Sequence, residues 1–440
     1  MKIKNQAIWA FTVSLAGFLF GFDTVVISGA NLPMKELWNT GTWFHGAIMS
    51  MALWGTVAGS LFGGIPVQKI GRKKTLIWIG VLYFISAVGS ALAPDPITFS
   101  IFRFIGGLGV GASTIAGPAY VSEISSPSNR GRLVALYQFN LVLGILIAFI
   151  SNYLLKGFDG GNDWRWMLGV EAIPAAIYFV AVLGVPKSPR WLITVKNDVE
   201  GARKVLMKMG IDDPEKELQD ILESEKQVHS TEPFIKKYKK PLILAVLLAF
   251  FNQLSGINFV LYYAPQILEI AGLASKESLF NSISIGGINL LFTFVGLFLI
   301  DRVGRRQLLI VGSFGYIGSL LMIALSFYAD LGSGILLASI LAFIASHAIG
   351  QGAIIWVFIA EIFPNHVRPF GQSWGTGTHW VFAALITLLG PVVISLFQEN
   401  PWPIFVFFAG MMVLQLLFAL FMMPETKGIS LEDIQKKLGI

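Results

Sequence analysis

The stretch QKIGRKK at residues 68–74 recurs in altered form as DRVGRRQ at residues 301–307, and each copy follows a long apolar segment. A second pair recurs in the same order: SEISSPSNRGR at 122–132 and AEIFPNHVRPF at 360–370. In both members of this pair a glutamate precedes an arginine by seven residues. Self-similarity of this kind indicates a duplicated unit, and in membrane proteins it predicts a pseudo-two-fold axis with a central site between the halves.

The composition is that of a membrane protein. Of the 440 residues 55% are hydrophobic and 13% are charged, whereas a soluble domain carries about 25% charged residues. Helices are the expected elements, because the bilayer core offers no water to backbone groups. The absence of cysteine excludes disulfides, thiolate metal sites and cysteine nucleophiles. The net charge of +6 is concentrated in short loops, so it does not indicate nucleic-acid binding.

The chain contains twelve candidate membrane spans. A helix needs about 20 apolar residues to cross the bilayer, and we expect spans at 7–30, 46–68, 75–93, 97–121, 131–154, 166–185, 241–270, 279–300, 307–328, 334–361, 369–397 and 402–423. The sequence therefore predicts an all-α membrane protein with two pseudo-symmetric six-helix bundles, at 1–185 and 241–423. A cytoplasmic linker at 186–240 and a short tail at 424–440 complete the chain. Two linker segments, 198–210 and 214–226, are expected to form amphipathic helices.

The charges of the loops predict the orientation. Basic residues follow the second, fourth, eighth and tenth spans and fill the linker, whereas the opposite loops are short and mixed or acidic. The positive-inside rule then places both termini in the cytoplasm. The stretch MKIKNQ leads directly into a span too long for a cleavable signal, so the first helix is expected to act as its own targeting signal. We expect a multi-pass protein of the bacterial inner membrane.

The repeated charges all fall on the predicted cytoplasmic side. They are interpreted as an inter-helix ion-pair network that latches the two halves together when the cavity opens outward. The alternative is ordinary topogenic charge, which requires no repeated spacing. The residues of this network are Arg72, Glu123, Arg130, Arg305, Glu361 and Arg368.

Together, these motifs resemble the sugar-porter family of the major facilitator superfamily over nearly the whole chain. The resemblance rests on GFDTVVISG (21–29), IGRKK, RFIGGLGVGA (103–112), SEISSPSNRGR, PKSPRWL (186–192), NQLSGINFVLYYAP (252–265), DRVGRR, AEIFPNHVR and PETKG (424–428). The chain looks most like bacterial proton-coupled monosaccharide symporters, D-xylose–proton symporters among them, and is more distantly similar to animal facilitative glucose transporters. It departs from the family pattern in having Gln68 for an acid, Lys187 for a glutamate and Asn252 for a glutamine.

Asp23 lies inside the first span with no basic residue nearby in sequence. A bare carboxylate in hydrocarbon costs several kcal/mol or more. Arg103, in the fourth span, lies at a similar depth, given about 1.5 Å of rise per residue. The two are therefore expected to pair. The resemblance implies that Asp23 is the protonation site with Arg103 as its partner; the alternative is a permanent structural ion pair.

A sugar site needs amides, which donate and accept hydrogen bonds, and aromatic rings for the apolar face of the sugar. The mid-span amides Gln138, Asn252, Gln253, Asn258 and Asn289 fit this need, and Ser255-Gly256 predicts a broken helix among them. For any one amide the alternative is a helix–helix hydrogen bond. Further candidates for the site are Phe20, Tyr262, Trp356, His379 and Trp380. By resemblance, Gln138, Asn252, Gln253, Asn258, Asn289, Trp356 and Trp380 fall on sugar-contacting positions, and His379 stands where relatives often carry an amide.

The function expected is import of a pentose or hexose coupled to proton entry, by alternating access. A facilitative uniporter is the alternative, and Asp23 argues against it. A sugar sensor would carry a long cytoplasmic tail, whereas only about 16 residues follow the last span. We find no nucleophile–base set, cofactor motif or metal-ligand spacing, so neither an enzyme nor a cofactor is expected. The expected partners are the monosaccharide, the proton and the bilayer, with no nucleic acid, and the protein is expected to be a monomer.

Overall fold

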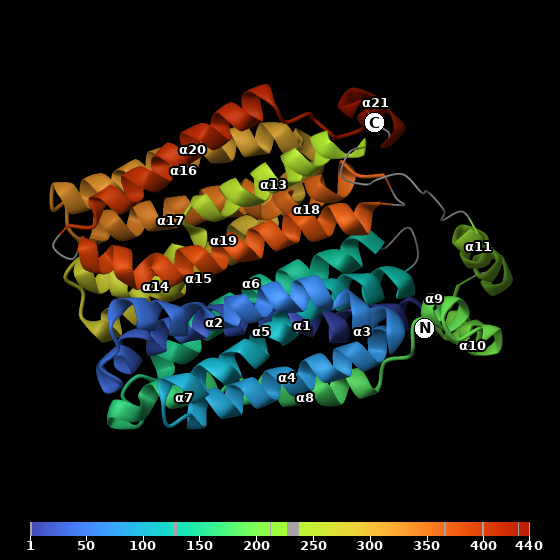
Figure 1. Ribbon diagram of the computed structural model, residues 1–440, viewed down its shortest axis with the longest axis horizontal. Helices are drawn as coiled ribbons and strands as arrows, with labels where there is room; N and C mark the ends of the chain where they lie inside the picture. Colours follow the sequence, from blue (N-terminus) through green and yellow to red (C-terminus); the bar gives the residue numbers. More distant parts are fainter. Residues whose placement is uncertain are drawn as a thin grey trace. The chain divides into compact units, whose positions relative to one another are not determined.

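The computed structural model describes residues 2–125, 130–211, 213–226, 237–364, 367–397, 400–429 and 431–439. Over these residues every regular element is a helix (Figure 1). The elements are α1 (Lys2–Leu37), α2 (Thr42–Phe62), α3 (Gly64–Lys69), α4 (Arg72–Leu92), α5 (Pro96–Ile124), α6 (Arg130–Leu155), η1 (Gly160–Asn162), α7 (Asp163–Gly169), α8 (Ala172–Leu183), α9 (Pro189–Thr194), α10 (Val199–Met209), α11 (Pro214–Lys226), α13 (Lys239–Leu254), α14 (Ile257–Ile270), α15 (Ser275–Val303), α16 (Arg305–Tyr328), α17 (Ser333–Ile349), α18 (Gln351–Glu361), α19 (Arg368–Leu396), α20 (Trp402–Phe421) and α21 (Leu431–Leu438).

Eleven candidate spans within the described residues are long and apolar enough to cross a membrane. Three of them combine shorter helices: η1 and α7 with α8, α13 with α14, and α17 with α18. The remaining expected span, 46–68, corresponds to α2 and α3; α2 has 21 residues but is not among the eleven. The protein is therefore an integral membrane protein.

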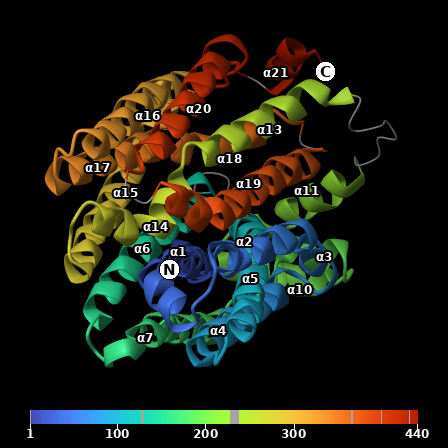
Figure 2. The same cartoon turned by 60° about the vertical axis from the view of Figure 1, so that its left-hand side comes forward.

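Contacts between residues group the chain into two compact units. Unit 1 comprises Met1–Thr24, Met51–Ala148 and Arg165–Thr231, and unit 2 comprises Val25–Ser50, Phe149–Trp164 and Glu232–Ile440. In unit 1, α4 packs beside α5 and α8; in unit 2, α13 packs beside α19, and α16 beside α17 and α20 (Figure 2). The division into bundles at 1–185 and 241–423 is not decided by this grouping and stays a prediction.

Small residues bring α2 and α5 into close contact. A Cβ added at Gly107 would lie 1.9 Å from the backbone oxygen of Ala52, far closer than any side-chain carbon can approach. Gly111 faces Thr56 in the same way, at 2.3 Å. This is the role expected of small residues between membrane helices. The GGLGVGASTIAG stretch (106–117) therefore serves helix packing.

The linker contains the helices that its pattern predicts. Segment 198–210 forms α10, which begins where the Asp198 side chain accepts a hydrogen bond from the Gly201 amide at 2.8 Å and ends at Gly210 with φ +74°. Segment 214–226 forms α11. The Gln6 amide donates to the Met209 carbonyl at 2.7 Å, so the start of α1 is joined to the end of α10.

Candidate functional site

Asp23 and Arg103 form a buried ion pair in unit 1. Asp23 on α1 is 2% exposed and Arg103 on α5 is 1% exposed. One guanidinium nitrogen donates to Asp23 Oδ1, and another donates to the Asp23 backbone oxygen at 3.0 Å. The contact predicted from equal depth is thus confirmed, whereas the role of the pair in proton coupling stays a prediction.

A third ionisable group, Glu171, lies beside this pair and was missed by the sequence reasoning. It occupies the break between α7 and α8 and is 1% exposed. Its carboxyl interacts electrostatically with Asp23 and Arg103, but neither of its oxygens makes a hydrogen bond of sound geometry to a described residue. An acid within an apolar span is the signal that identified Asp23, and it applies equally to Glu171.

The cluster contains two carboxyls and one guanidinium. If both carboxyls were ionised, the cluster would carry a net negative charge away from water, which costs several kcal/mol. Tyr83 on α4, 0% exposed, interacts electrostatically with both carboxyls, so a buried hydroxyl also lies near the cluster.

In unit 2 three of the five predicted amides, Asn252, Gln253 and Asn258, lie together at the expected break in the helix. Between α13 and α14, Gly256 has φ +85°, a conformation that glycine adopts freely and other residues rarely do. Gln253 is at the centre of the cluster: its amide nitrogen donates to Asn252 Oδ1 at 3.0 Å and contacts the His379 ring nitrogens at 3.1 and 3.2 Å. Asn258 in turn donates to Gln253 Oε1 at 2.7 Å.

A chain of polar contacts extends this cluster toward α20. Gln351, 0% exposed, lies 3.4 Å from the Asn252 amide nitrogen and donates to Gln415 at 2.7 Å. Gln415 then donates to Ser313 at 2.9 Å. Sequence reasoning did not identify Gln351 or Gln415, although both are mid-span amides. These two glutamines join neighbouring helices by hydrogen bonds, which is the alternative role given above for any single amide within a span.

Aromatic rings adjoin the amides. The His379 ring lies 5.0 Å from the Trp356 ring and 4.7 Å from the Trp380 ring, between centroids. Trp380 is 3% exposed, whereas Trp356 is 37% exposed, so one indole face stays open beside the buried amides.

The other sugar-site candidates are distributed over both units. Tyr262 and Asn289 are buried in unit 2; in unit 1, Phe20 is at 9% exposure and Gln138 is half-buried. The Asn289 side chain makes no hydrogen bond to another residue of the described part of the chain, so its amide group has unused donors and acceptors.

Each of the two repeated glutamates forms an ion pair with an arginine of its own unit. In unit 1, Arg72 at the start of α4 donates to Glu123 Oε1 at 2.7 and 3.1 Å, and Ser188 donates to the other Glu123 oxygen at 2.5 Å. In unit 2, Arg305 at the start of α16 donates to Glu361 at 2.7 and 3.1 Å, and Thr426 donates to Glu361 at 2.6 Å. Each pair joins helices within its own unit, and the latch between halves stays a prediction.

The other two arginines of the predicted network are Arg130 and Arg368. The side chain of Arg130 lies outside the described residues. Arg368 contacts the Phe363 carbonyl at 3.5 Å. Burial lowers the pKa of Arg368, and the nearby Glu361 carboxylate opposes this effect.

Glu425 distinguishes the two ion-pair sites. Its carboxylate accepts hydrogen bonds from the backbone amides of Arg305 and Arg306, at 3.0 and 3.1 Å, and thereby caps the N-terminus of α16. Burial raises the pKa of Glu425, but the backbone hydrogen bonds outweigh burial and hold the pKa below its ordinary value. In unit 1 the corresponding residue is Lys187, and within the described part of the chain no side chain caps α4.

No group of three or more His, Cys, Asp or Glu that could hold a metal occurs among the residues searched, which are the described ones. His347 on α17 is hydrogen-bonded to the Tyr316 hydroxyl at 2.5 Å.

Comparisons with known proteins give a consistent result. The family model described as "Sugar (and other) transporter" matches residues 9–438. The arabinose-proton symporter of Bacillus subtilis (strain 168) is 34% identical over 438 residues, covering 96% of this chain and 92% of that protein. The D-xylose transporter of Levilactobacillus brevis is 34% identical over 446 residues, covering 99% of this chain and 96% of that protein.

Solved structures agree. The partially occluded inward-open conformation of the xylose transporter XylE from E. coli matches with a TM-score of 0.87 at 29% identity, covering 97% of this chain and all of that one. A second XylE structure, titled as a major facilitator superfamily proton:xylose symporter, matches with a TM-score of 0.84. The predicted major facilitator fold is thus confirmed, and with nearly its whole length matched the chain belongs to the sugar (and other) transporter family.

Proposed function

We propose that this protein is a secondary transporter that imports a monosaccharide together with a proton. The observation that carries the proposal is the buried cluster of Asp23, Arg103 and Glu171, in which two acids share one base. A purely structural ion pair needs no second acid, and a uniporter needs no buried acid. The relatives of this chain include arabinose-proton and galactose-proton symporters, which supports the same conclusion.

In the proposed cycle, a proton from outside binds to the carboxyl pair and neutralises the excess charge. Arg103 then binds Asp23 less tightly, because the attraction between ion and neutral acid is weaker than that between opposite charges. Sugar binding and the change of access follow, and the proton leaves on the other side. The proton and sugar sites are coupled only if each changes the equilibrium between the same two conformations.

The amide cluster centred on Gln253 is the proposed sugar site. Its side chains offer both donors and acceptors, as a ring of hydroxyls requires, and Trp356 offers a partly exposed ring face. Asn289, with its unused hydrogen-bonding groups, would add one further contact to the sugar.

Location and organisation complete the proposal. Both termini lie in the cytoplasm and the protein lies in the bacterial inner membrane, which is supported by the basic residues after alternate spans. The bundles comprise 1–185 and 241–423, joined by the linker 186–240. The protein functions as a monomer with one sugar site.

Uptake into proteoliposomes tests the proposal. Arabinose, xylose, galactose and glucose are each offered with an inward proton gradient, without a gradient, and with a gradient plus a protonophore. We expect at least one sugar to accumulate above its outside concentration, only when the gradient is present. Uptake that stops at equal concentrations under all three conditions would identify a uniporter instead.

A further inference from the structure

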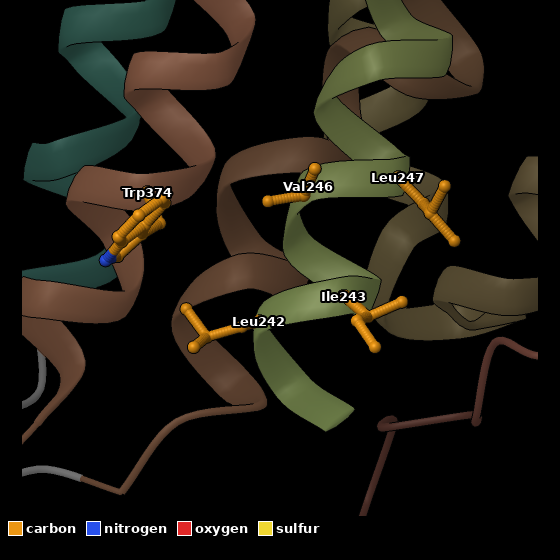
Figure 3. A pocket seen from close by; sticks show the side chains of 5 residues that line it. All are labelled: Leu242, Ile243, Val246, Leu247 and Trp374. Carbon is orange, nitrogen blue, oxygen red and sulfur yellow. The ribbon is translucent and has the colours of Figure 1, made fainter. Parts of the chain in front are cut away.

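An apolar groove runs between the first turns of α13 and the corresponding part of α19. It is lined by Leu242, Ile243, Val246 and Leu247 on α13 and by Trp374 on α19, and its volume is about 260 Å³ (Figure 3). Ile243 is 41% exposed and Trp374 is 50% exposed. All five residues belong to unit 2, where α13 and α19 pack side by side.

The chemistry of the lining indicates an acyl chain. Four aliphatic side chains and an indole ring offer water almost no hydrogen-bonding partner, so the groove suits hydrocarbon better than a column of water. The helices on both sides are candidate membrane spans. Half-exposed apolar residues on such helices are solvated by lipid tails.

Basic side chains stand at the end of the groove where α13 begins. Lys239 precedes Leu242 by three residues and Ile243 by four, so these side chains share one helix face. Lys240 stands in the same relation to Ile243. Both lysines are exposed.

The C-terminal helix α21 ends beside this point. Lys240 Nζ donates to the Lys437 carbonyl at 3.3 Å, which holds the end of α21 beside the start of α13. Lys436 and Lys437 are both exposed, and Asp433 lies 3.8 Å from Lys436. The sequence of α21 contains two acids, Glu432 and Asp433, against these two lysines, so Lys239 and Lys240 of α13 provide the excess positive charge. The local balance is positive.

We propose that the α13–α19 groove binds an anionic glycerophospholipid. One acyl chain occupies the groove against Trp374, and the phosphate lies on Lys239 and Lys240. Charge complementarity favours this occupant. A lipid with no net charge would leave the positive charges of the two lysines uncompensated, and a second copy of this chain would have to bury those charges. Basic clusters at the cytoplasmic ends of membrane helices attract anionic headgroups in this way.

Fluorescence quenching tests the proposal. The purified full chain in detergent is titrated with phosphatidylglycerol that carries brominated acyl chains, which quench nearby indoles. The Trp374 signal is taken as the difference between the wild type and Trp374→Phe, a variant that keeps an aromatic ring and hence the packing. Phosphatidylcholine with the same brominated chains serves as the neutral reference.

We expect phosphatidylglycerol to quench Trp374 at lower concentration than phosphatidylcholine. Each lysine near an anionic surface contributes about 1 kcal/mol, so K239Q/K240Q should weaken phosphatidylglycerol binding about 30-fold, which is about 2 kcal/mol. K239Q alone should weaken it about 5-fold, and this milder variant keeps the test valid if the double variant does not fold. The matched control K204Q/K208Q, which removes two exposed lysines of α10, should leave binding unchanged.

Several outcomes would overturn the proposal. Equal quenching by the two lipids would identify ordinary lipid-facing surface, and the same loss in K204Q/K208Q would identify a non-specific charge effect. Competition by glycerophosphate, which has no acyl chain, would identify a simple phosphate site. A dimer by light scattering that dissociates on Trp374→Phe would identify a second copy as the occupant.

Discussion

Glu425 and Lys187 occupy corresponding positions of the two halves. Replacing each of them tests whether a carboxylate at this position stabilises the protein by capping a helix. Glu425 follows Pro424 and precedes Thr426, whose hydroxyl donates to Glu361. Lys187 is followed by Ser188, whose hydroxyl donates to the equivalent Glu123. Only the carboxylate caps a helix.

The magnitude follows from the hydrogen bonds that Glu425 accepts. Four backbone amides donate to it, those of Arg305, Arg306, Thr426 and Lys427. Hydrogen bonds to charged groups contribute about 1.5–3 kcal/mol, and a glutamine keeps one acceptor oxygen. Glu425→Gln should therefore lower the free energy of unfolding by about 1–2 kcal/mol, with a fall in Tm of about 1–2 °C for a chain of 440 residues.

The reciprocal change should stabilise the protein. Lys187 interacts unfavourably with Lys73, which lies in the first turn of α4. Lys187→Glu removes this repulsion and supplies a carboxylate to an uncapped helix N-terminus, which is worth about 0.5–2 kcal/mol. We expect Tm to rise by up to about 2 °C.

Thermal unfolding of the detergent-purified protein, followed by size exclusion with fluorescence detection, measures both changes. Because the folded pKa of Glu425 is lowered, its stabilisation is present above the unfolded carboxyl pKa and is lost as pH falls through the folded value. The difference between wild type and Glu425→Gln should thus shrink below about pH 4. Glu277→Gln, at an exposed carboxyl of the same unit, is the control. An unchanged Tm in both Glu425→Gln and Lys187→Glu would refute the reasoning.

Three further predictions concern the core of each unit. Gln253→Ala should raise the KM for sugar at least tenfold in counterflow, because it removes the centre of the amide cluster; an unchanged KM would remove the cluster from the sugar site. Glu171→Gln should reduce proton-driven accumulation about tenfold or more while counterflow continues, with partial rescue by Glu171→Asp, and full accumulation would show that one carboxyl suffices. Gly107→Ala should lower stability by about 1–3 kcal/mol, since its Cβ would meet the Ala52 oxygen at 1.9 Å; a wild-type Tm would contradict the close contact of α2 with α5.

Much of the fold follows from the sequence because hydrophobic length and repetition are local signals. The linker helices and the break at Ser255-Gly256 were predicted from the kinds of residue present, and the structure contains them. Asp23 and Arg103 could be paired from depth alone, because helices of known direction convert residue number into position.

Long-range partners were harder to predict. Ser188 and Thr426 complete the two ion-pair sites from segments far away in sequence, and no periodicity links them to Glu123 or Glu361. Glu171 was missed although it carries the same signal as Asp23, an acid within an apolar span. Gln351 was missed because its role is visible only in the hydrogen bonds that continue from it to Gln415, on a different helix.

The most direct test of the central claim, that the acid on α1 couples proton entry to sugar transport, is Asp23→Asn in proteoliposomes. Sugar counterflow and proton-driven accumulation are measured in the same preparation, with Asp330→Asn as the matched control, because Asp330 is exposed and its positive φ suits asparagine. The account predicts that Asp23→Asn exchanges sugar but no longer concentrates it, whereas the control does both. Accumulation by Asp23→Asn at the wild-type level would contradict the account.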